Sequence, residues 1–532
     1  MGILALDYDC LRLVISFLDS RDVLHLCLTC KQLYDLAHHQ ILVNLHLLSV
    51  PQVRGFWKWL RTKDGHRDLA LTIKHLGFWA NPMLWFGPGD GNMESLRWSL
   101  VDVLNASRNI RSLQLNVNML LAHNVRIGSS IASMKHLVRL ELADYDDATL
   151  MALRAIEAPL TSLRLSISSY NFSVDPKTPS LLAIFLAISR FRDTLRVLSI
   201  QVMQESAPRG VPPSQLAPFP ALRVVTLSHN RHVPFDIYSL FPNAEVIKVY
   251  NFRTTLQDRE GGLRSLKYLA AVPSEIVNHA RRFPRTPYLH LLGTSSGRAP
   301  RQSHIDAVHS VGPLGLAFEL PSSNVGSDFW TGLSAAAPQL KCLLVTLQLP
   351  RWSRRTKQPA DEDEDAVAFV KVLVRVASSH IDKFQLSCLC VAWNSFTTTR
   401  IDDAYRELRE SDLDLNKPAH EHLSARARAV HTFPQRVAKA SPTLKHVGLW
   451  HPRPPRDPLA RFRERRREDV FPRWHVDVYD TDAITDDIRW WKVVDEDHAG
   501  RRLDDCSKGE AKEAWLSQVD RDWALLQLLE EF

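Results

Sequence analysis

The sequence predicts an α/β fold in which N-terminal amphipathic helices precede an irregular solenoid of short parallel strands and helices. Two patterns predict it. Apolar residues recur at helical spacing across residues 11–34, with one polar break at residues 19–22, and a short apolar motif recurs between residues 110 and 449. The 532-residue chain is 45% hydrophobic and 23% charged. This composition is ordinary for a globular protein, so a chain of this length can bury a core along its repeats.

The N-terminal pattern consists of two apolar stripes, each typical of one face of an α-helix. The first stripe holds residues spaced i, i+3, i+4 and i+7, namely Leu11, Val14, Ile15 and Leu18. The polar break offers N-cap side chains for a second helix. That helix carries the stripe Val23, Leu26, Cys27 and Cys30, continued by Leu33 and Tyr34. Leu24 and Leu28 lie beside this stripe, so a helix pair this small must pack on the rest of the chain or on a partner.

These helices and the break between them resemble the F-box, the adaptor-binding motif of substrate receptors in SCF-type ubiquitin ligases. The opening Leu6-Asp7-Tyr8-Asp9 keeps the leucine and the later acid of that motif but lacks its usual proline. Asp7 can cap the same helical turn instead. The resemblance implies that a Skp-family adaptor binds the apolar residues Leu6, Leu11, Val14, Leu18, Leu24, Leu26, Cys30 and Leu33. The structural alternative for residues 1–45 is a helical cap that shields the open end of a solenoid.

The body of the chain repeats the motif apolar-x-x-apolar-x-apolar. Ten copies, some of them partial, begin at Ile110, Leu137, Leu160, Leu195, Leu222, Ala244, Leu263, Leu340, Ile381 and Leu444. The last two apolar residues of a copy alternate as in a strand with one face in a core, and stretches such as residues 180–190 can supply a covering helix. We expect buried side chains on parallel strands stacked in chain order at Leu113, Leu115, Leu140, Leu142, Leu163, Leu165, Leu198, Val225 and Leu227. An α/β domain with ordinary buried strands is the alternative.

The irregular spacing of the copies is typical of a leucine-rich-repeat solenoid. Together with the N-terminal helices, it resembles the divergent F-box proteins with degenerate leucine-rich repeats that are abundant in filamentous fungi. In such a solenoid, substrate specificity is expected on the polar residues that alternate with the inward leucines. The candidates for substrate binding are Gln114, Arg139, Glu141, Arg164, Thr226, Lys248 and Tyr250. They are mixed in charge, so they do not name the substrate.

The chain divides by pattern into four segments. Residues 1–45 form the F-box-like helical motif, and residues 46–105 form a connecting region and first repeat, with a first strand expected at residues 68–73. Residues 106–450 form the solenoid, with a charged surface loop at residues 351–365. Residues 451–532 hold an Arg-rich stretch and a C-terminal cap whose helix is expected at residues 510–529. Such a cap is needed because the last repeat otherwise exposes apolar surface. The Arg-rich stretch is interpreted as an exposed charged segment, and a nuclear-import or phosphate-binding patch is the alternative.

Composition and motifs argue against several functional classes. The net charge of +7 is concentrated near residues 452–473, so no nucleic-acid partner is indicated, and no apolar run is long enough to span a membrane. The seven cysteines lack a disulfide framework. The lack of a disulfide framework and of an apparent signal peptide favours a cytoplasmic or nuclear location. The spacing Cys27-x-x-Cys30 lacks a second ligand pair, so no metal or other cofactor is expected. No catalytic motif is present either.

By resemblance, the chain is expected to be a non-catalytic substrate-recognition subunit of an SCF-type ubiquitin ligase. The F-box would bind the Skp-family adaptor, and through it a cullin–RING ligase, while the solenoid would hold an unidentified protein substrate. Its contribution would be proximity rather than bond chemistry. Two other interpretations remain open: a leucine-rich-repeat scaffold outside any ligase, and an enzyme whose catalytic residues are distant in sequence.

Overall fold

The chain folds into two compact units in a computed structural model. The first unit comprises Met1–Asn243 with Asp457–His475, and the second comprises Ala244–Arg456 with Val476–Phe532. The structure describes residues 7–16, 18, 20–47, 49–62, 65–78, 92–116, 121, 124–167, 179–202, 216–229, 232–233, 238–250, 253–254, 263, 266–283, 286–292, 302–321, 327–348, 383–394, 434–435, 437–450, 488–496 and 500–506.

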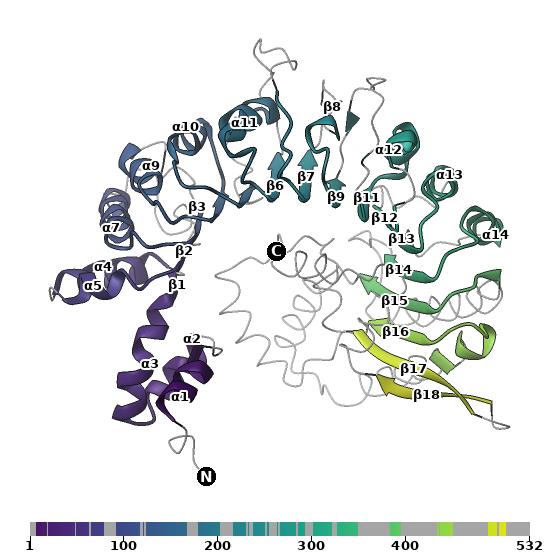
Figure 1. Cartoon of the computed structure of the whole chain (residues 1–532), viewed down its shortest axis with the longest axis horizontal. Coiled ribbons are helices and arrows are strands. Elements are labelled where there is room, and N and C mark those ends of the chain that lie inside the picture. Colours follow the sequence, from purple (N-terminus) through teal and green to yellow (C-terminus); the bar gives the residue numbers. More distant parts are fainter. Residues whose placement is uncertain are drawn as a thin grey trace, which may run out of the picture. The chain divides into compact units, whose positions relative to one another are not determined.

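The first unit begins with helices and continues as alternating strands and helices (Figure 1). Its helices are α1 (Tyr8–Ser16), α2 (Ser20–Cys27), α3 (Lys31–Val43), α4 (Val50–Thr62), α5 (Gly65–Ala70), α7 (Asn92–Ala106), α9 (Val125–Ala132), α10 (Asp147–Ala155) and α11 (Leu181–Ile188), with 3-10 turns η2 (Ser189–Phe191) and η4 (Tyr238–Leu240). Its strands are β1 (Asn44–Leu47), β2 (His75–Phe78), β3 (Ser112–Asn116), β4 (Arg139–Ala143), β5 (Ser162–Ser166), β6 (Val197–Val202), β7 (Val224–His229) and β8 (His232–Val233). Strands β1 to β7 form a parallel sheet in chain order.

The second unit repeats this alternation and ends differently. Its helices are α12 (Pro273–Asn278), α13 (Gln302–Val311) and α14 (Ser327–Ala336), with the 3-10 turn η5 (Ala280–Arg282). Its strands are β9 (Val246–Tyr250), β10 (Arg253–Thr254), β11 (Tyr268–Ala271), β12 (Tyr288–Leu291), β13 (Gly315–Pro321), β14 (Cys342–Gln348), β15 (Cys388–Asn394), β16 (His446–Trp450), β17 (Ile488–Glu496) and β18 (Gly500–Cys506). The sheet runs parallel from β9 through β11 to β16, and β17 and β18 then add antiparallel.

The expected inward leucines are buried on parallel strands, which confirms a solenoid-like region of mixed α/β structure. Leu113, Leu140 and Leu163 pair in register on β3, β4 and β5, and Leu198 and Val225 continue the same row on β6 and β7. Each of these five side chains has no measurable exposure, and each of the partners Leu115, Leu142, Leu165 and Leu227 is at most 1% exposed. The alternation of Leu-x-Leu places both leucines on the same face of the strand, and the register stacks them into one core.

Backbone hydrogen bonds join successive repeats just before each strand begins. The carbonyl of Arg111 accepts the N–H groups of both Val138 and Arg139, at 2.8 and 2.9 Å. In the next repeat, the carbonyl of Val138 accepts the N–H groups of Thr161 and Ser162, at 2.9 and 3.2 Å. A carbonyl has two lone pairs, so one acceptor satisfies two backbone donors. The same arrangement recurs in each repeat from β3 to β7, which fixes the strand register.

Helices lie together on one side of the strands within each unit. Figure 1 shows α7, α9, α10 and α11 on the same side of β3 to β6, and α12, α13 and α14 on one side of β11 to β14. The expected covering helix at residues 180–190 is confirmed as α11 followed by η2. Helix α10 begins with a capping box, in which the Asp146 carboxylate accepts the N–H of Thr149 at 2.8 Å and the Thr149 hydroxyl accepts the N–H of Asp146 at 3.1 Å. These caps satisfy first-turn donors that the helix itself cannot pair.

Three sequence predictions about the strands were wrong. Residues 68–73 lie in α5 and the turn after it, and the strand of that repeat is β2, built on Leu76 and Phe78. The copy expected to begin at Leu263 begins three residues later. Leu269 on β11 pairs with Ile247 on β9 and occupies the inward position that was expected for Leu266. Likewise, β15 carries Leu389 and Val391, five residues beyond the expected strand. The structure also places β1, β2, β12 and β13, which the motif search missed.

Several predictions fall on residues outside those described. These are the charged loop at residues 351–365, the Arg-rich stretch at residues 461–467 and the C-terminal helix at residues 510–529. The division of the chain at residues 45, 105 and 450 stays a prediction.

Candidate functional site

The N-terminal helices pack around a small core of their own. Ile15 on α1, Val23 and Cys27 on α2, and Ala37 on α3 are buried together, and Leu18, Leu26 and Leu36 pack against them partly buried. Most residues of the two apolar stripes therefore face inward, whereas Val14 and Tyr34 are exposed. At the start of α1, the Asp7 carboxylate accepts the N–H of Tyr8 at 2.7 Å, so it satisfies one donor of the first helical turn.

The second apolar stripe does not form one continuous helix. Helix α2 ends at Cys27, and α3 begins at Lys31 after a turn. In that turn the hydroxyl of Thr29 donates to the carbonyl of Leu26 at 2.7 Å, and Cys30 adopts an extended conformation. A threonine hydroxyl that bonds back to the preceding turn competes with helix continuation. The predicted second helix is therefore two helices, and the motif contains three in all among the residues described.

Several large apolar side chains on the outer surfaces of these helices are exposed in the part of the chain that the structure describes. Leu24 is 46% exposed and Leu28 is 77% exposed. The N–H of Leu28 donates to the carbonyl of Leu24 at 3.1 Å, so the two leucines lie one helical turn apart on the same side. Tyr8, Leu13, Val14 and Tyr34 are further large side chains at least 38% exposed. Exposed leucines one turn apart are suited to a partner rather than to water.

The predicted adaptor-binding residues divide by exposure. Val14 and Leu24 are exposed, Leu18, Leu26 and Cys30 are half-buried, and Leu11 and Leu33 are buried at 3% exposure each; Leu6 lies outside the described residues. Leu11 and Leu33 therefore cannot contact an adaptor directly and can only pack beneath the exposed side chains that do. Leu28, Leu13, Tyr8 and Tyr34 were missed as surface candidates. For Leu28, Leu13 and Tyr8, the position beside the stripes was the available signal, because a residue off the buried stripe faces outward. Tyr34 was assigned to the stripe itself, so no such signal marked it.

The predicted substrate-binding residues of the first unit form a connected row across neighbouring strands. Gln114, Glu141 and Arg164 occupy one register row on β3, β4 and β5. The Gln114 amide donates to Glu141 Oε2 at 3.0 Å, and Arg164 Nε lies 3.4 Å from Glu141 Oε1. Burial raises the pKa of the Glu141 carboxyl, while Arg164, the Gln114 hydrogen bond and Arg139 act in the opposite direction. The row is thus half-buried and internally bonded rather than fully open to solvent.

The remaining predicted substrate-binding residues lie elsewhere on the sheet. Thr226 continues the same row on β7, through Ser199 on β6, and is half-buried. Lys248 on β9 has its ammonium 6.0 Å from the centre of the Tyr268 ring. Tyr250, expected at the surface, is only 6% exposed. Thr226 lies in the first unit, and Lys248 and Tyr250 lie in the second.

The second unit contains a row of chemically active side chains that sequence reasoning missed. Cys342, Cys388 and His446 are register partners on β14, β15 and β16. Cys388 Sγ lies 4.0 Å from His446 Nδ1, and a hydrogen bond from Cys342 lowers the pKa of Cys388 to about 6. Both thiols are at most 1% exposed, so they are shielded from substrates. No sequence signal linked these residues, because register alone brings them together.

Neither of two other site classes is found in the described part of the chain. No group of three or more His, Cys, Asp or Glu side chains there is placed to hold a metal ion. Among the same residues, no helix is long and apolar enough to cross a membrane.

Comparison with known families agrees with the geometry of the N-terminal helices. Residues 3–44 match the F-box domain family, which is the segment containing the shared core and the exposed leucines. No curated protein matches the chain significantly. The chain therefore carries an F-box domain, formed by α1 to α3, ahead of its sheet of mostly parallel strands.

Proposed function

We propose that this protein is a substrate-recognition subunit of an SCF-type ubiquitin ligase. Its F-box would bind a Skp-family adaptor and through it a cullin–RING ligase, in the cytoplasm or nucleus. Its repeats, of leucine-rich type, would hold a protein substrate. The protein would act by bringing two partners together, without catalytic residues of its own.

The observation that carries the proposal is the exposure of Leu24 and Leu28 on a domain whose inward residues are already packed. A helical cap of a solenoid would need only the buried core of Ile15, Val23 and Cys27. The two leucines instead project outward, 46% and 77% exposed. Desolvating such side chains at an interface is a common source of binding free energy. The F-box match over the same residues makes a Skp-family adaptor the proposed partner.

Substrate recognition is proposed for the strand row in the first unit. Gln114, Glu141 and Arg164 offer a donor, an acceptor and a cation on consecutive strands. Their mutual bonds hold the side chains in place, so a substrate would meet a preorganised polar surface. The mixed charge of the row is suited to a protein surface rather than to a nucleic acid.

The test is adaptor binding by a variant with both exposed leucines replaced, Leu24→Asp with Leu28→Asp. Truncating central apolar anchors commonly costs about 2 kcal/mol or more, which is roughly thirtyfold in affinity. The control is Met151→Asp, which adds one negative charge on α10 at a side chain 64% exposed, compared with two in the double variant. Binding to the purified adaptor, and recovery of cullin from cells, should fall for the double variant alone.

Equal adaptor binding by the double variant and the wild type would remove the proposal. Adaptor binding without cullin recovery would point to a repeat scaffold outside a ligase. Circular dichroism of the double variant checks that α1 to α3 remain folded.

A further inference from the structure

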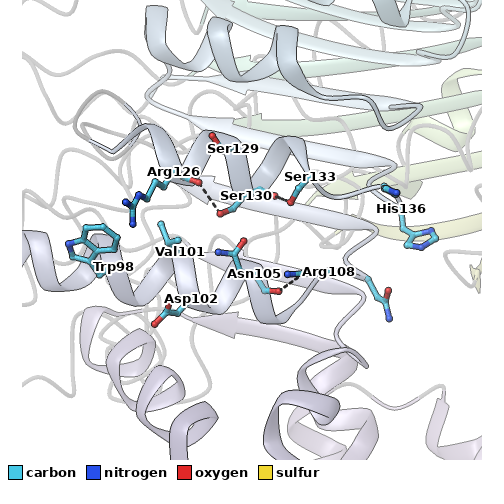
Figure 2. Close-up of a pocket in the computed structure, with 12 residues that line it drawn as sticks. Trp98, Val101, Asp102, Asn105, Arg108, Arg126, Ser129, Ser130, Ser133 and His136 are labelled. Atoms are coloured by element: carbon cyan, nitrogen blue, oxygen red, sulfur yellow. Dashed lines mark hydrogen bonds between the residues drawn. The ribbon is translucent and has the colours of Figure 1, made fainter.

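An open polar groove lies between α7 and α9 on the helical side of the first unit. Figure 2 shows the two helices facing each other, with Trp98 and Asn105 from α7 opposite Arg126 and the serines of α9. The groove has a volume of about 740 Å³. This is within the usual range for ligand sites. It belongs to the helices, so it is separate from both the F-box surface and the strand row.

The groove exists because this pair of helices is less closely packed than the next pair. Helices α9 and α10 meet through small residues, and a Cβ added at Gly128 would lie 3.2 Å from the Ala152 Cβ. Between α7 and α9, the lining holds the apolar Trp98 and Val101, but most of its residues are polar or charged. Asn105 of α7 and Arg126 of α9 keep their side chains in solvent. The serines of α9 direct their hydroxyls back onto helical carbonyls, as Ser130 does to Arg126 at 2.9 Å. The space between the helices therefore stays unfilled.

Cationic side chains lie along the groove and are held in position. The Arg126 guanidinium lies 4.6 Å from the centre of the exposed Trp98 ring, an arrangement that restricts a long side chain. Arg108 Nε donates to the Asn105 carbonyl at 3.1 Å. This bond does not use the two terminal nitrogens of the Arg108 guanidinium. Lys135 also lines the groove. Among the residues described, none of these three cations forms an ion pair.

The carboxylate in the groove lining does not cancel these charges. Asp102 Oδ2 accepts the indole N–H of Trp57 at 2.8 Å and lies 3.6 Å from a terminal nitrogen of Arg61. Both partners come from α4, outside the groove. Asp102 is thus already paired with a cation outside the groove, and the three cations of the lining outnumber this one carboxylate.

We propose that this groove binds an acidic peptide segment of a partner protein, with Asp or Glu carboxylates paired to Arg108, Arg126 and Lys135. Guanidinium groups pair with carboxylates in a planar, two-bond geometry. The Asn105 amide, exposed between the cations, offers a donor and an acceptor for the peptide backbone. Trp98 offers an apolar surface for a neighbouring side chain. The proposal goes beyond adaptor binding and strand-face recognition, and depends on neither.

A peptide is favoured over a nucleic acid by the local composition. The groove is bounded by two helices that run in the same direction (Figure 2). Its lining has one ion-paired carboxylate and few cations, whereas a nucleic-acid surface tracks many phosphates with Lys and Arg. Short side chains on the α9 wall, such as Ser129 and Ser133, leave room for a peptide backbone to lie along it.

The experiment measures fluorescence anisotropy of a labelled peptide containing five alternating Asp and Glu residues, added to the full-length protein at low and physiological ionic strength. A peptide of equal length with Asn and Gln is the probe control. The variant Arg108→Gln with Arg126→Gln should weaken binding of the acidic peptide about tenfold or more, because two charge-assisted pairs are lost. Arg154→Gln, an exposed arginine of α10 outside the groove, is the matched control and should bind as the wild type does.

Lys135→Glu is a second variant at an exposed turn residue, chosen because it leaves both helices unchanged, and it should also weaken binding. Hydrogen exchange should show α7 and α9 protected by the acidic peptide. The proposal is overturned if the wild type binds the acidic and neutral peptides equally, or if Arg154→Gln weakens binding as much as the groove variants. Tighter binding of a single-stranded oligonucleotide, lost in the same variants, would overturn the peptide assignment.

Discussion

Glu141 and Arg164 occupy the same register position on adjacent parallel strands, with Arg164 Nε 3.4 Å from Glu141 Oε1. The carboxylate also accepts a hydrogen bond from Gln114 on the strand before. The Glu141 side chain is 12% exposed and that of Arg164 is 27% exposed. Water therefore reaches the cation more readily than the carboxylate. Loss of either partner should then have unequal effects.

Replacing Arg164 should destabilise the first unit more than replacing Glu141. Arg164→Gln leaves a mostly buried carboxylate with one fewer partner, which should cost about 1–3 kcal/mol. Glu141→Gln leaves Arg164 able to turn to solvent and should cost less. Urea denaturation of the single and double variants measures both. In the double variant the loss should be smaller than for Arg164→Gln alone, and strict additivity would contradict the coupling.

The same pair predicts a pH effect. Burial raises the folded-state pKa of Glu141 above its ordinary value of 4.5, and removing Arg164 should raise it further. A carboxyl with a raised pKa binds protons more tightly when folded, so stability falls as pH rises from 4.5 through the raised value. Arg164→Gln should therefore be most destabilising at neutral pH and recover on acidification. A difference in unfolding free energy between the wild type and Arg164→Gln that stays constant from pH 4 to pH 7 would contradict this account.

His290 should make the second unit sensitive to acid. Burial, aided by the charge of Lys248, lowers the pKa of His290 from 6.5 to about 3, and the ring lies 3.1 Å from the Tyr268 hydroxyl. The folded state then binds a proton more weakly than the unfolded state, so stability is lost as pH falls below 6.5. Between pH 8 and pH 5 this group alone should contribute a loss of about 2 kcal/mol.

The comparison is with His290→Gln, measured by chemical denaturation at several pH values. The variant should start less stable at pH 8, because the Tyr268 hydrogen bond is altered. It should then show a shallower fall toward pH 5 than the wild type. Parallel curves for the two proteins would rule out His290 as the source.

The leucine row should carry the stability of the first unit. Leu163→Ala removes a side chain with no measurable exposure and should cost about 2–5 kcal/mol. Val138→Ala, at a side chain 39% exposed one strand away, should change stability by less than about 0.5 kcal/mol. Amide exchange in β4, β5 and β6 provides the local measurement. Similar effects of the two substitutions would mean that the row does not form the core.

The strands of the sheet were predictable where the leucine pattern had only one possible alignment. Leu113, Leu140 and Leu163 are such positions, because alternation with polar neighbours assigns them to one face. Near residue 386 two alignments satisfy the pattern, Phe384 with Leu386 and Leu389 with Val391, and sequence spacing alone did not decide between them. Residues 68–73 alternate over a window so short that it also fits a helical turn.

The candidate sites were predictable only in part. The apolar stripes identified the F-box, but the side of each helix that faces a partner depends on what its other side packs against. Leu11 and Leu33 were therefore expected at the surface and are buried, whereas Leu28 is exposed. The groove between α7 and α9 depends on the spacing of two helices, and no local motif marks Arg108 or Arg126.

Helix α3 ends at Val43 and strand β1 begins at Asn44, with no linking residue between them. The Val43 carbonyl accepts the N–H of Lys74 at 2.9 Å, which attaches this junction to the next repeat. A flexible tether would let the two ends sample many relative angles, whereas a junction with no linking residue restricts the angle between the helix and the sheet. Under the proposed function, a protein substrate held on the first repeats would face the ligase in one orientation. The lysine that receives ubiquitin would then be determined by its position on the substrate surface rather than by the sequence around it.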